Sequence, residues 1–296
     1  MTSELQTLIV ELEQDRALGD PARVCERAAA RDRLEAHLLD WHMGAGDERA
    51  DSAGFYERAQ AVDARLEAVD RELGRDIRRE IRRGVRPERL LRWMSGPGST
   101  GRPATPPAGE GYDHLDVLVS RVLRLEEPSV LAVEPTSEMV PYQPTPARHI
   151  FDLLSRTALS ERDVLVDLGS GLGHVPLLAS ICTGARGVGV ELEPAYVRSA
   201  RRSAVSLHLH RVIFLKQDAR EADFSNGTVF FLYTPFTGSI LRAVLDRLRR
   251  EATGREFCVG TLGPCTVTVA EEPWLQGVGP LRADRVAIFR LRERLP

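Results

Sequence analysis

Hydrophobic residues recur every three or four positions through most of residues 3–94, which is the spacing of one buried face of a helix. The clearest stripe is Val62, Leu66, Val69, Leu73, Ile77 and Ile81. Ser3 precedes a similar stripe, and Asp20-Pro21 predicts the start of a second helix that reaches about residue 41. The sequence GAGDERADSAG predicts a loop at 44–54. Together these features predict an all-α N-terminal domain over residues 1–94.

From residue 163 the pattern changes to short apolar runs that alternate with amphipathic segments. The runs cover 164–169, 187–192, 212–218, 228–234, 257–262 and 286–292. Uninterrupted, β-branched runs are typical of strands that are buried on both faces, and helical segments between them indicate βαβ units. A long irregular stretch before the last run predicts an antiparallel hairpin at the sheet edge. We therefore expect an α/β fold with a Rossmann-like, doubly wound, seven-stranded sheet whose last strand is antiparallel.

Residues 95–111, SGPGSTGRPATPPAGEG, are dense in Gly, Pro, Ser and Thr, which is typical of a linker. The sequence therefore predicts three parts, with boundaries at 1–94, 95–111 and 112–296. The third part begins with an amphipathic helix over residues 112–125. A Pro-rich segment, EMVPYQPTPARHIFDLL, then leads into another helix and the first predicted strand.

Composition and charge exclude several classes of protein. With 296 residues, 43% hydrophobic and 28% charged, the chain is long enough for one large folded domain and a smaller one. A formal net charge of -3 argues against a general polyanion binder, and nucleic acid is not the expected partner. No leader or run of about 18 apolar residues is present, which predicts a cytoplasmic protein without a membrane partner. The four cysteines form no C-x-x-C pair, so no metal is expected.

The candidate chemistry begins at VLVDLGSGLGHV, where a predicted strand runs directly into three glycines. Asp167, Gly169, Ser170, Gly171 and Gly173 carry this motif, which lies where ligands bind in parallel sheets, at the carboxyl ends of the strands. Alone it fits a dinucleotide, another ligand or a plain loop. The next strand ends in Glu191, about 20 residues on, which is placed to accept hydrogen bonds from ribose hydroxyls.

The third predicted strand ends near Asp218 and Ala219, where a carboxylate and a backbone N–H can bind adenine. These positions predict an adenosine site. The loop lacks the G-x-x-G spacing of a dinucleotide fingerprint, and Asp167 would repel a pyrophosphate. The same carboxylate suits the amino group and sulfonium of S-adenosylmethionine, so we favour that cofactor.

The motifs DLGSGLGHV, GVGVELEP, QDAREADF and VFFLYTPF resemble those of class I S-adenosylmethionine-dependent methyltransferases. VPYQPTPARHIFDLL followed by DVLVDLGSGLGHV is similar to the protein-lysine methyltransferases related to the mitochondrial enzymes that modify the ATP synthase c-subunit and the nucleotide carrier. It is more distantly similar to the non-SET histone lysine methyltransferases. The resemblance covers residues 138 to about 262.

This resemblance implies a role for each matching position. Asp167 and Gly169 to Gly173 would hold the methionine end, with Glu191 at the ribose and Asp218 at the adenine. Thr145 would lie over the cofactor, and Tyr142, Glu138 and Tyr233 are candidates to orient the acceptor or take its proton. The chain departs from the family at Leu172, at His174 and at YTPF, where many amino-group methyltransferases carry Asn or Asp.

The preferred hypothesis is methyl transfer to an amino group, with protein lysine as the candidate acceptor. A second hypothesis is a small-molecule methyltransferase whose N-terminal helices form a lid or a homodimer interface. A third is a protein that binds S-adenosylmethionine without turnover, while its helices and the arginine run at 75–86 bind a partner.

Overall fold

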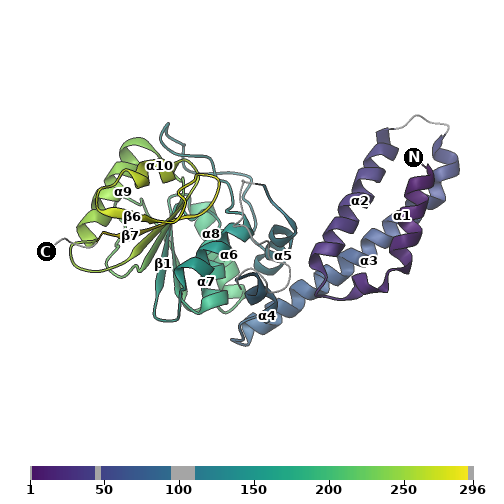
Figure 1. Ribbon diagram of the computed structural model, residues 1–296, viewed down its shortest axis with the longest axis horizontal. Coiled ribbons are helices and arrows are strands. Elements are labelled where there is room, and N and C mark those ends of the chain that lie inside the picture. The colour runs from purple at the N-terminus through teal and green to yellow at the C-terminus, as the bar shows by residue number, and fades with distance from the viewer. Residues whose placement is uncertain (1, 44–47, 95–110, 293–296) are drawn as a thin grey trace. The chain divides into compact units, whose positions relative to one another are not determined.

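The computed structural model describes residues 2–43, 48–94 and 111–292 (Figure 1). The chain divides into two compact units, an N-terminal unit of Met1–Arg78 and a C-terminal unit of Arg79–Pro296. The boundary between them falls inside helix α3 (Glu48–Arg82). The predicted linker lies outside the described residues except for Gly111, and the predicted division at 94 and 112 stays a prediction.

The N-terminal unit is helical, as predicted. It contains α1 (Thr2–Gln14), the 3-10 helix η1 (Arg16–Gly19), α2 (Val24–Met43) and most of α3. Its core is built from apolar residues of all three α-helices and η1, namely Leu5, Leu8, Ile9, Leu12, Leu18, Ala30, Leu34, Ala59, Val62 and Leu66. The first residues of the periodic stripe along α3, Val62 and Leu66, therefore pack in this core as their spacing predicts.

Two predicted boundaries in this unit are wrong. The Asp20 side chain accepts the Ala22 N–H at 2.8 Å, so it closes a turn, and α2 begins later, at Val24. Helix α3 begins at Glu48, inside the loop predicted at 44–54, because that polar stretch contains no strong helix breaker before Gly54. Residues 44–47 of that loop lie outside the described residues.

A buried ion pair joins α2 to α3. The Arg27 side chain is fully buried, and its Nε donates to Asp70 Oδ1 at 2.7 Å. Its terminal nitrogens donate to the carbonyls of Leu18, Asp20 and Pro21. Each of the three guanidinium nitrogens therefore donates to an oxygen, which is what makes a buried guanidinium tolerable.

In the C-terminal unit, four short helices precede a layered α/β fold. Those helices are α4 (Glu88–Leu91), η2 (Arg92–Met94), α5 (His114–Leu123) and α6 (Ala147–Thr157). The strands are β1 (Val164–Leu168), β2 (Arg186–Glu191), β3 (Val212–Lys216), β4 (Val229–Tyr233), β5 (Cys258–Leu262), β6 (Leu275–Val278) and β7 (Ala287–Leu291). The remaining helices are α7 (His174–Thr183), α8 (Pro194–Ser206), α9 (Gly238–Glu251) and α10 (Cys265–Ala270).

The seven strands form one sheet in the order β3-β2-β1-β4-β5-β7-β6. The first five in that order are parallel, while β7 is antiparallel to both β5 and β6. Helices α6 and α7 lie on one side of the sheet and α9 on the other (Figure 1). The predicted doubly wound, Rossmann-like sheet with an antiparallel last strand is confirmed. The strand order reverses between β1 and β4, which places the ligand crevice at the end of β1.

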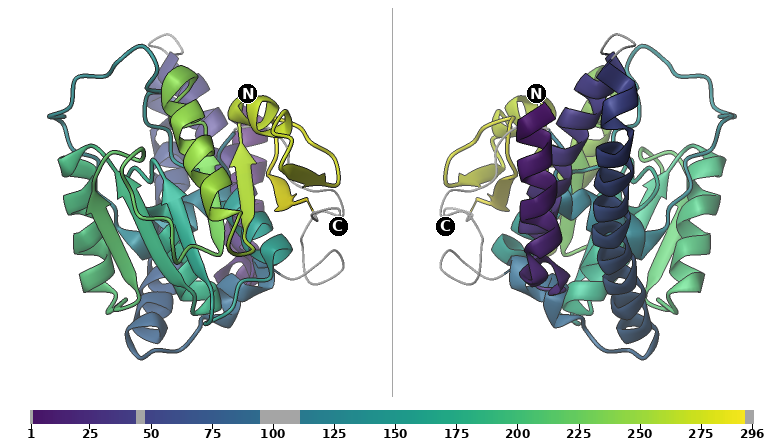
Figure 2. Two further views of the ribbon diagram at one scale, coloured as in Figure 1. Left: turned by 90° about the vertical axis from the view of Figure 1, so that its left-hand side faces the viewer. Right: turned by 90° about the vertical axis from the view of Figure 1, so that its right-hand side faces the viewer.

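A long segment between α5 and α6, residues 126–143, has no regular secondary structure apart from one bridge between Met139 and Phe236. We call it the strap. Figure 2 shows the strap at the end of the sheet toward which the parallel strands point. Glu193, just after β2, accepts the N–H groups of Ala132 and Val133, both at 2.9 Å. The strap is therefore fastened beside the expected ligand crevice.

No helix within residues 2–43, 48–94 and 111–292 has both the length and the hydropathy needed to cross a membrane.

Candidate functional site

The loop between β1 and α7 needs glycine at three positions. Gly169, Gly171 and Gly173 have φ values of 80°, 50° and 87°, in the left-handed region that favours glycine. A Cβ at Gly169 would come within 2.2 Å of Pro235, and one at Gly171 within 2.1 Å of the Tyr142 ring. The glycine loop is therefore where β1, the strap and the end of β4 meet.

The amide groups of this loop are directed toward β2. Gly169 and Ser170 donate to the Val190 carbonyl at 2.9 and 3.0 Å, and Gly171 donates to Glu191 Oε2 at 2.8 Å. The other Glu191 oxygen accepts the Glu193 N–H at 2.8 Å. These contacts hold the predicted ribose-binding carboxylate against the glycine loop.

Two carboxyl groups lie together beneath this loop. Asp167 is 4% exposed, and burial raises its pKa well above the usual range, with a smaller contribution from the charge of Glu191. Burial also raises the pKa of Glu191, although the amides of Glu193 and Gly171 oppose the rise. When two buried carboxyl groups lie side by side, a nearby cation stabilises their ionised forms.

The residues at this end fit the predicted cofactor. The Ser170 hydroxyl is buried and has no hydrogen-bond partner among the described residues. The loop offers a cradle that any Cβ would fill, and Asp167 supplies negative charge for an ammonium or a sulfonium. Asp167, Ser170 and the glycines would thus hold the methionine end of S-adenosylmethionine, with Glu191 at the ribose.

The predicted adenine residues follow β3, the neighbour of β2. The Gln217 N–H donates to the Glu191 carbonyl at 3.0 Å, so Asp218 and the buried Ala219 lie close to the ribose position. The Asp218 carboxylate is engaged by Arg220 at 2.7 Å, which lowers its pKa. An adenine amine would have to share Asp218 with this exposed arginine.

Tyr142, at the end of the strap, covers the glycine loop. Its ring lies against Gly171, its centroid is 4.8 Å from that of Tyr196, and its hydroxyl is 3.5 Å from His174 Nδ1. Burial raises the pKa of Tyr142 above its usual range, and burial lowers the pKa of His174 to about 4. Both side chains are therefore neutral near pH 7.

Thr145 follows Tyr142 and is buried, at 9% exposed. The chain on either side of Thr145 is held by Tyr112, which lies just before α5, and by Asp116 in α5. The Tyr112 hydroxyl donates to the Pro144 carbonyl at 2.9 Å, and the Ala147 N–H donates to Asp116 at 2.7 Å. The Pro-rich approach is thus a rigid connection into α6.

Glu138 lies at the start of α9. Its two carboxylate oxygens accept the Ser239 N–H at 2.8 Å, the Ser239 hydroxyl at 2.7 Å and the Ile240 N–H at 3.2 Å. The Ser239 donors lower the pKa of Glu138, which makes it a weaker proton acceptor. These contacts describe a helix cap, and the catalytic role expected for Glu138 stays a prediction.

The end of β4 turns sharply at Tyr233-Thr234-Pro235. Thr234 has a φ of 35°, which is an outlier for a β-branched residue. Its buried hydroxyl donates to the Leu262 carbonyl at 2.9 Å and accepts the Cys265 N–H at 3.1 Å. This turn directs Pro235 onto Gly169, while Phe236 packs into the core around β4 rather than into an open pocket.

The structure thus brings Asp167, the glycine loop, Glu191 and Tyr142 together, with Asp218 and Ala219 at the next strand. Sequence reasoning missed Tyr196 and Glu193. Glu193-Pro194 is a helix start that the sequence displays, so Tyr196 in its first turn could have been found from that signal. Within the described part of the chain, no group of three His, Cys, Asp or Glu residues could hold a metal ion.

The strand order, the glycine loop after β1 and the carboxylates after β2 and β3 define a class I S-adenosylmethionine-dependent methyltransferase. The model of the family described as "Histone methylation protein DOT1" matches residues 130–231. The match begins in the strap and ends in β4, so it includes the glycine loop, Glu191 and Asp218. No curated protein matches the chain.

Several solved structures are similar to parts of the chain. An RNA methyltransferase from Salinibacter ruber in complex with S-adenosyl-L-homocysteine has 28% identity, covers 52% of this chain and 97% of its own, and gives a TM-score of 0.43. Precorrin-6y C5,15-methyltransferase from Geobacter metallireducens has 18% identity, with coverages of 52% and 93% and a TM-score of 0.41. A SAM-dependent methyltransferase from Thiobacillus denitrificans has 22% identity, coverages of 42% and 49% and a TM-score of 0.34.

Proposed function

We propose that the chain methylates the side-chain amine of a protein lysine. The family match supports this, because the matched family is described by histone methylation. The resemblance of VPYQPTPARHIFDLL to the c-subunit lysine methyltransferases points to the same acceptor group. The family match at 130–231 includes VPYQPTPARHIFDLL, so both similarities include residues upstream of the glycine loop.

One observation carries the proposal: the strap and the end of β4 meet directly on the glycine loop. Tyr142 covers Gly171, Pro235 covers Gly169, and the Val140 N–H donates to the Pro235 carbonyl at 3.2 Å. We infer that a methyl acceptor approaches the methionine end beside Tyr142 and the Tyr233-Thr234-Pro235 turn. The groups at that place are aromatic rings, a proline ring and backbone carbonyls, which suit a slender methylene chain that ends in an amine.

The cofactor supplies a methyl group that the sulfonium already activates. The protein then has to exclude water, orient the amine and favour its neutral form. Apolar surroundings lower the pKa of a lysine amine, which favours loss of its proton. The raised pKa of Tyr142 keeps its hydroxyl protonated, so Tyr142 is suited to orienting the amine and poorly suited to taking its proton.

The test is incubation of the full chain with methyl-labelled S-adenosylmethionine and fractionated cell extract, followed by mapping of labelled residues by mass spectrometry. Label on lysine side chains supports the proposal. Gly171→Ala serves as the inactive variant because its Cβ would collide with Tyr142. Gly254→Ala is the matched control, since a Cβ there meets nothing within 4 Å.

Two outcomes would overturn the proposal in different ways. Label that moves into an organic-extractable product, and not into protein, would support the small-molecule alternative. Tight binding of S-adenosylhomocysteine with no methylated product in any fraction would support the non-catalytic alternative.

A further inference from the structure

The end of the sheet opposite the glycine loop, where the parallel strands begin, carries a row of arginines. Arg162 precedes β1, Arg186 begins β2 and Arg211 precedes β3. These strands are neighbours, and their pairing sets Val164 beside Arg186 and Gly187 beside Val212. All three arginines are exposed. The row therefore crosses three adjacent strands, a width of about 10 Å at the usual strand spacing.

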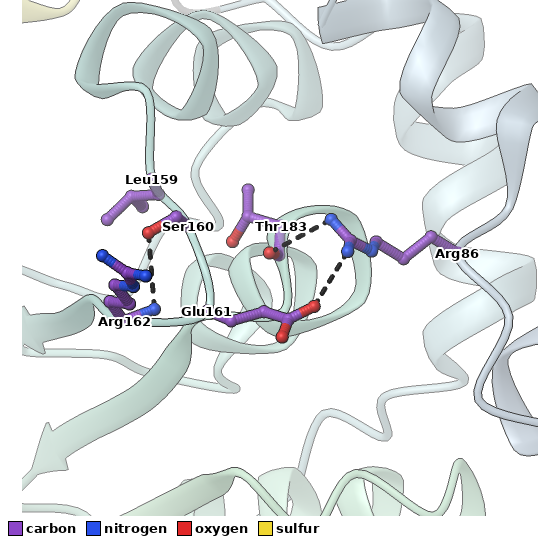
Figure 3. A pocket seen from close by; sticks show the side chains of 6 residues that line it. All are labelled: Arg86, Leu159, Ser160, Glu161, Arg162 and Thr183. Carbon is purple, nitrogen blue, oxygen red and sulfur yellow. Dashed lines mark hydrogen bonds and ion pairs between the residues drawn. The ribbon is translucent and has the colours of Figure 1, made fainter.

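The last residue of α3 and the segment that follows it add three more arginines to this end. Arg82 Nε donates to the Ser206 carbonyl at 2.8 Å, at the end of α8. Arg86 donates to Glu161 at 2.8 Å and to the Thr183 carbonyl at 3.4 Å, across a cleft of about 290 Å³ (Figure 3). Arg83 lies between them in the sequence and is exposed. We call this set the arginine edge: Arg82, Arg83, Arg86, Arg162, Arg186 and Arg211.

Glu161 is the carboxylate at the centre of the arginine edge. It pairs with Arg86, and its backbone carbonyl accepts from Arg211 at 2.6 Å. Asp163, nearby, is turned inward and accepts from Ser160 and Thr228. The six arginines outnumber the carboxylate that pairs with one of them, so the arginine edge carries a net positive charge.

The balanced charge of the whole chain hides this surface. The N-terminal unit has 11 Lys and Arg against 18 Asp and Glu, a net charge of -7, whereas the C-terminal unit has 29 against 25, a net charge of +4. The expectation that nucleic acid is not a partner rests on the total of -3, which averages two units of opposite sign. A partner responds to the local electrostatic field of the surface that it meets, so the net charge of the whole chain is a poor guide to whether nucleic acid binds.

Helix capping explains only half of the arginine edge. Arg82, Arg86 and Arg211 reach backbone carbonyls, and two of these carbonyls lie at helix ends, where positive charge is favourable. Arg83, Arg162 and Arg186 have no side-chain partner among residues 2–43, 48–94 and 111–292. Their mutual repulsion would be relieved by an anion that spans several of them.

We propose that the arginine edge binds the phosphate backbone of a nucleic acid. Guanidinium groups bind phosphate in a bidentate manner, and a row about 10 Å wide is long enough to contact more than one phosphate of a nucleic-acid strand. The arginine edge is at the opposite end of the sheet from the glycine loop, so a bound nucleic acid leaves the methyl-transfer site open. This proposal does not depend on lysine being the acceptor.

The test measures binding of the full chain to a short labelled DNA duplex by fluorescence anisotropy over a range of salt concentrations. A dissociation constant of about 10⁻⁶ to 10⁻⁴ M near physiological salt is expected, with a steep loss of affinity as salt rises. The variant Arg83→Gln/Arg162→Gln/Arg186→Gln should bind at least about tenfold more weakly and reduce the salt slope by about 2 to 3.

The matched control is Arg198→Gln/Arg202→Gln/Arg282→Gln, which removes three exposed arginines away from the arginine edge. It should bind the duplex as the unchanged chain does. Calorimetry with S-adenosylhomocysteine should give equal affinity for both triple variants, which shows that the fold is intact. Absence of duplex binding, equal losses in the two variants, or binding to anionic lipid vesicles in place of the duplex would each overturn the proposal.

Discussion

Replacing Gly171 by alanine tests whether the glycine loop and Tyr142 form one site. The new Cβ would lie 2.1 Å from Tyr142 Cε2, whereas carbon atoms pack at about 3.5 to 4.0 Å. The ring must therefore move by more than about 1 Å, which disturbs its contact with Tyr196, worth about 0.5 to 1.5 kcal/mol. The φ of 50° adds about 1 to 2 kcal/mol for any residue with a Cβ.

The sum predicts that Gly171→Ala lowers the free energy of unfolding by about 1.5 to 3.5 kcal/mol, as measured by urea titration. Affinity for S-adenosylhomocysteine should fall at least about tenfold in calorimetry, because Tyr142 and the loop amides both shift. Gly254→Ala should change the free energy of unfolding by less than about 1 kcal/mol.

A second variant separates the two contributions. In a Tyr142→Ala background the collision is absent, so Gly171→Ala should cost only the backbone part, about 1 to 2 kcal/mol. Unchanged stability and cofactor affinity in Gly171→Ala alone would refute the packing of Tyr142 on the loop. Equal costs in the two backgrounds would refute the contact while leaving the backbone argument intact.

Further predictions concern buried charge and buried thiols. Asp70→Ala should lower the free energy of unfolding, measured by urea titration, by about 3 to 5 kcal/mol because it leaves Arg27 buried without its carboxylate. Glu11→Ala, which breaks an exposed ion pair, should lower it by less than about 1 kcal/mol in the same titration. Because burial raises the pKa of Asp167 in the folded chain, its contribution to stability is full below the unfolded value of about 3.9 and is lost as pH rises from there through the raised folded pKa. Asp167→Asn should therefore have a higher Tm than the unchanged chain at pH 7, a difference that disappears below about pH 4, and should lose affinity for S-adenosylhomocysteine. Burial raises the pKa of Cys182 to about 12 and that of Cys258 to about 11, so neither thiol should react with a thiol reagent at pH 8 until denaturant is added.

Much of the sheet could be predicted because its strands are buried on both faces. Runs such as Val164–Leu168 and Val229–Tyr233 are almost entirely buried, so their sequences are nearly uninterrupted apolar stretches. Strand β6 is different, since most of its residues are partly or fully exposed and its sequence, LQGV, has no such signature. The stretch before β7 was expected to be irregular, but α10 forms within it. The N–H of Cys265, the first residue of α10, donates to the Thr234 hydroxyl.

The site residues that directly follow strands could be predicted from the sequence. Contacts between residues far apart in the sequence could not. Asp167, Glu191 and Asp218 are marked by their place at strand ends. The cap that Glu138 provides for α9 lies 101 residues from its partner, and sequence patterns for caps extend over only a few residues. Arg27 is similar, since nothing in its local sequence distinguishes a buried arginine from an exposed one.

The strap has a consequence for the order in which the molecule is made. Glu193, which fastens it, lies 61 residues after Ala132, and Ser239, at the other anchor, lies 101 residues after Glu138. At about 5 to 20 residues per second, the ribosome delivers the second anchor roughly 5 to 20 seconds after the strap has been synthesised. In the later part of that interval the glycine loop has been synthesised, but Ser239, the second anchor of the strap, has not. Closure of the site is therefore a late event of synthesis, which waits for the end of β4 and the first turn of α9.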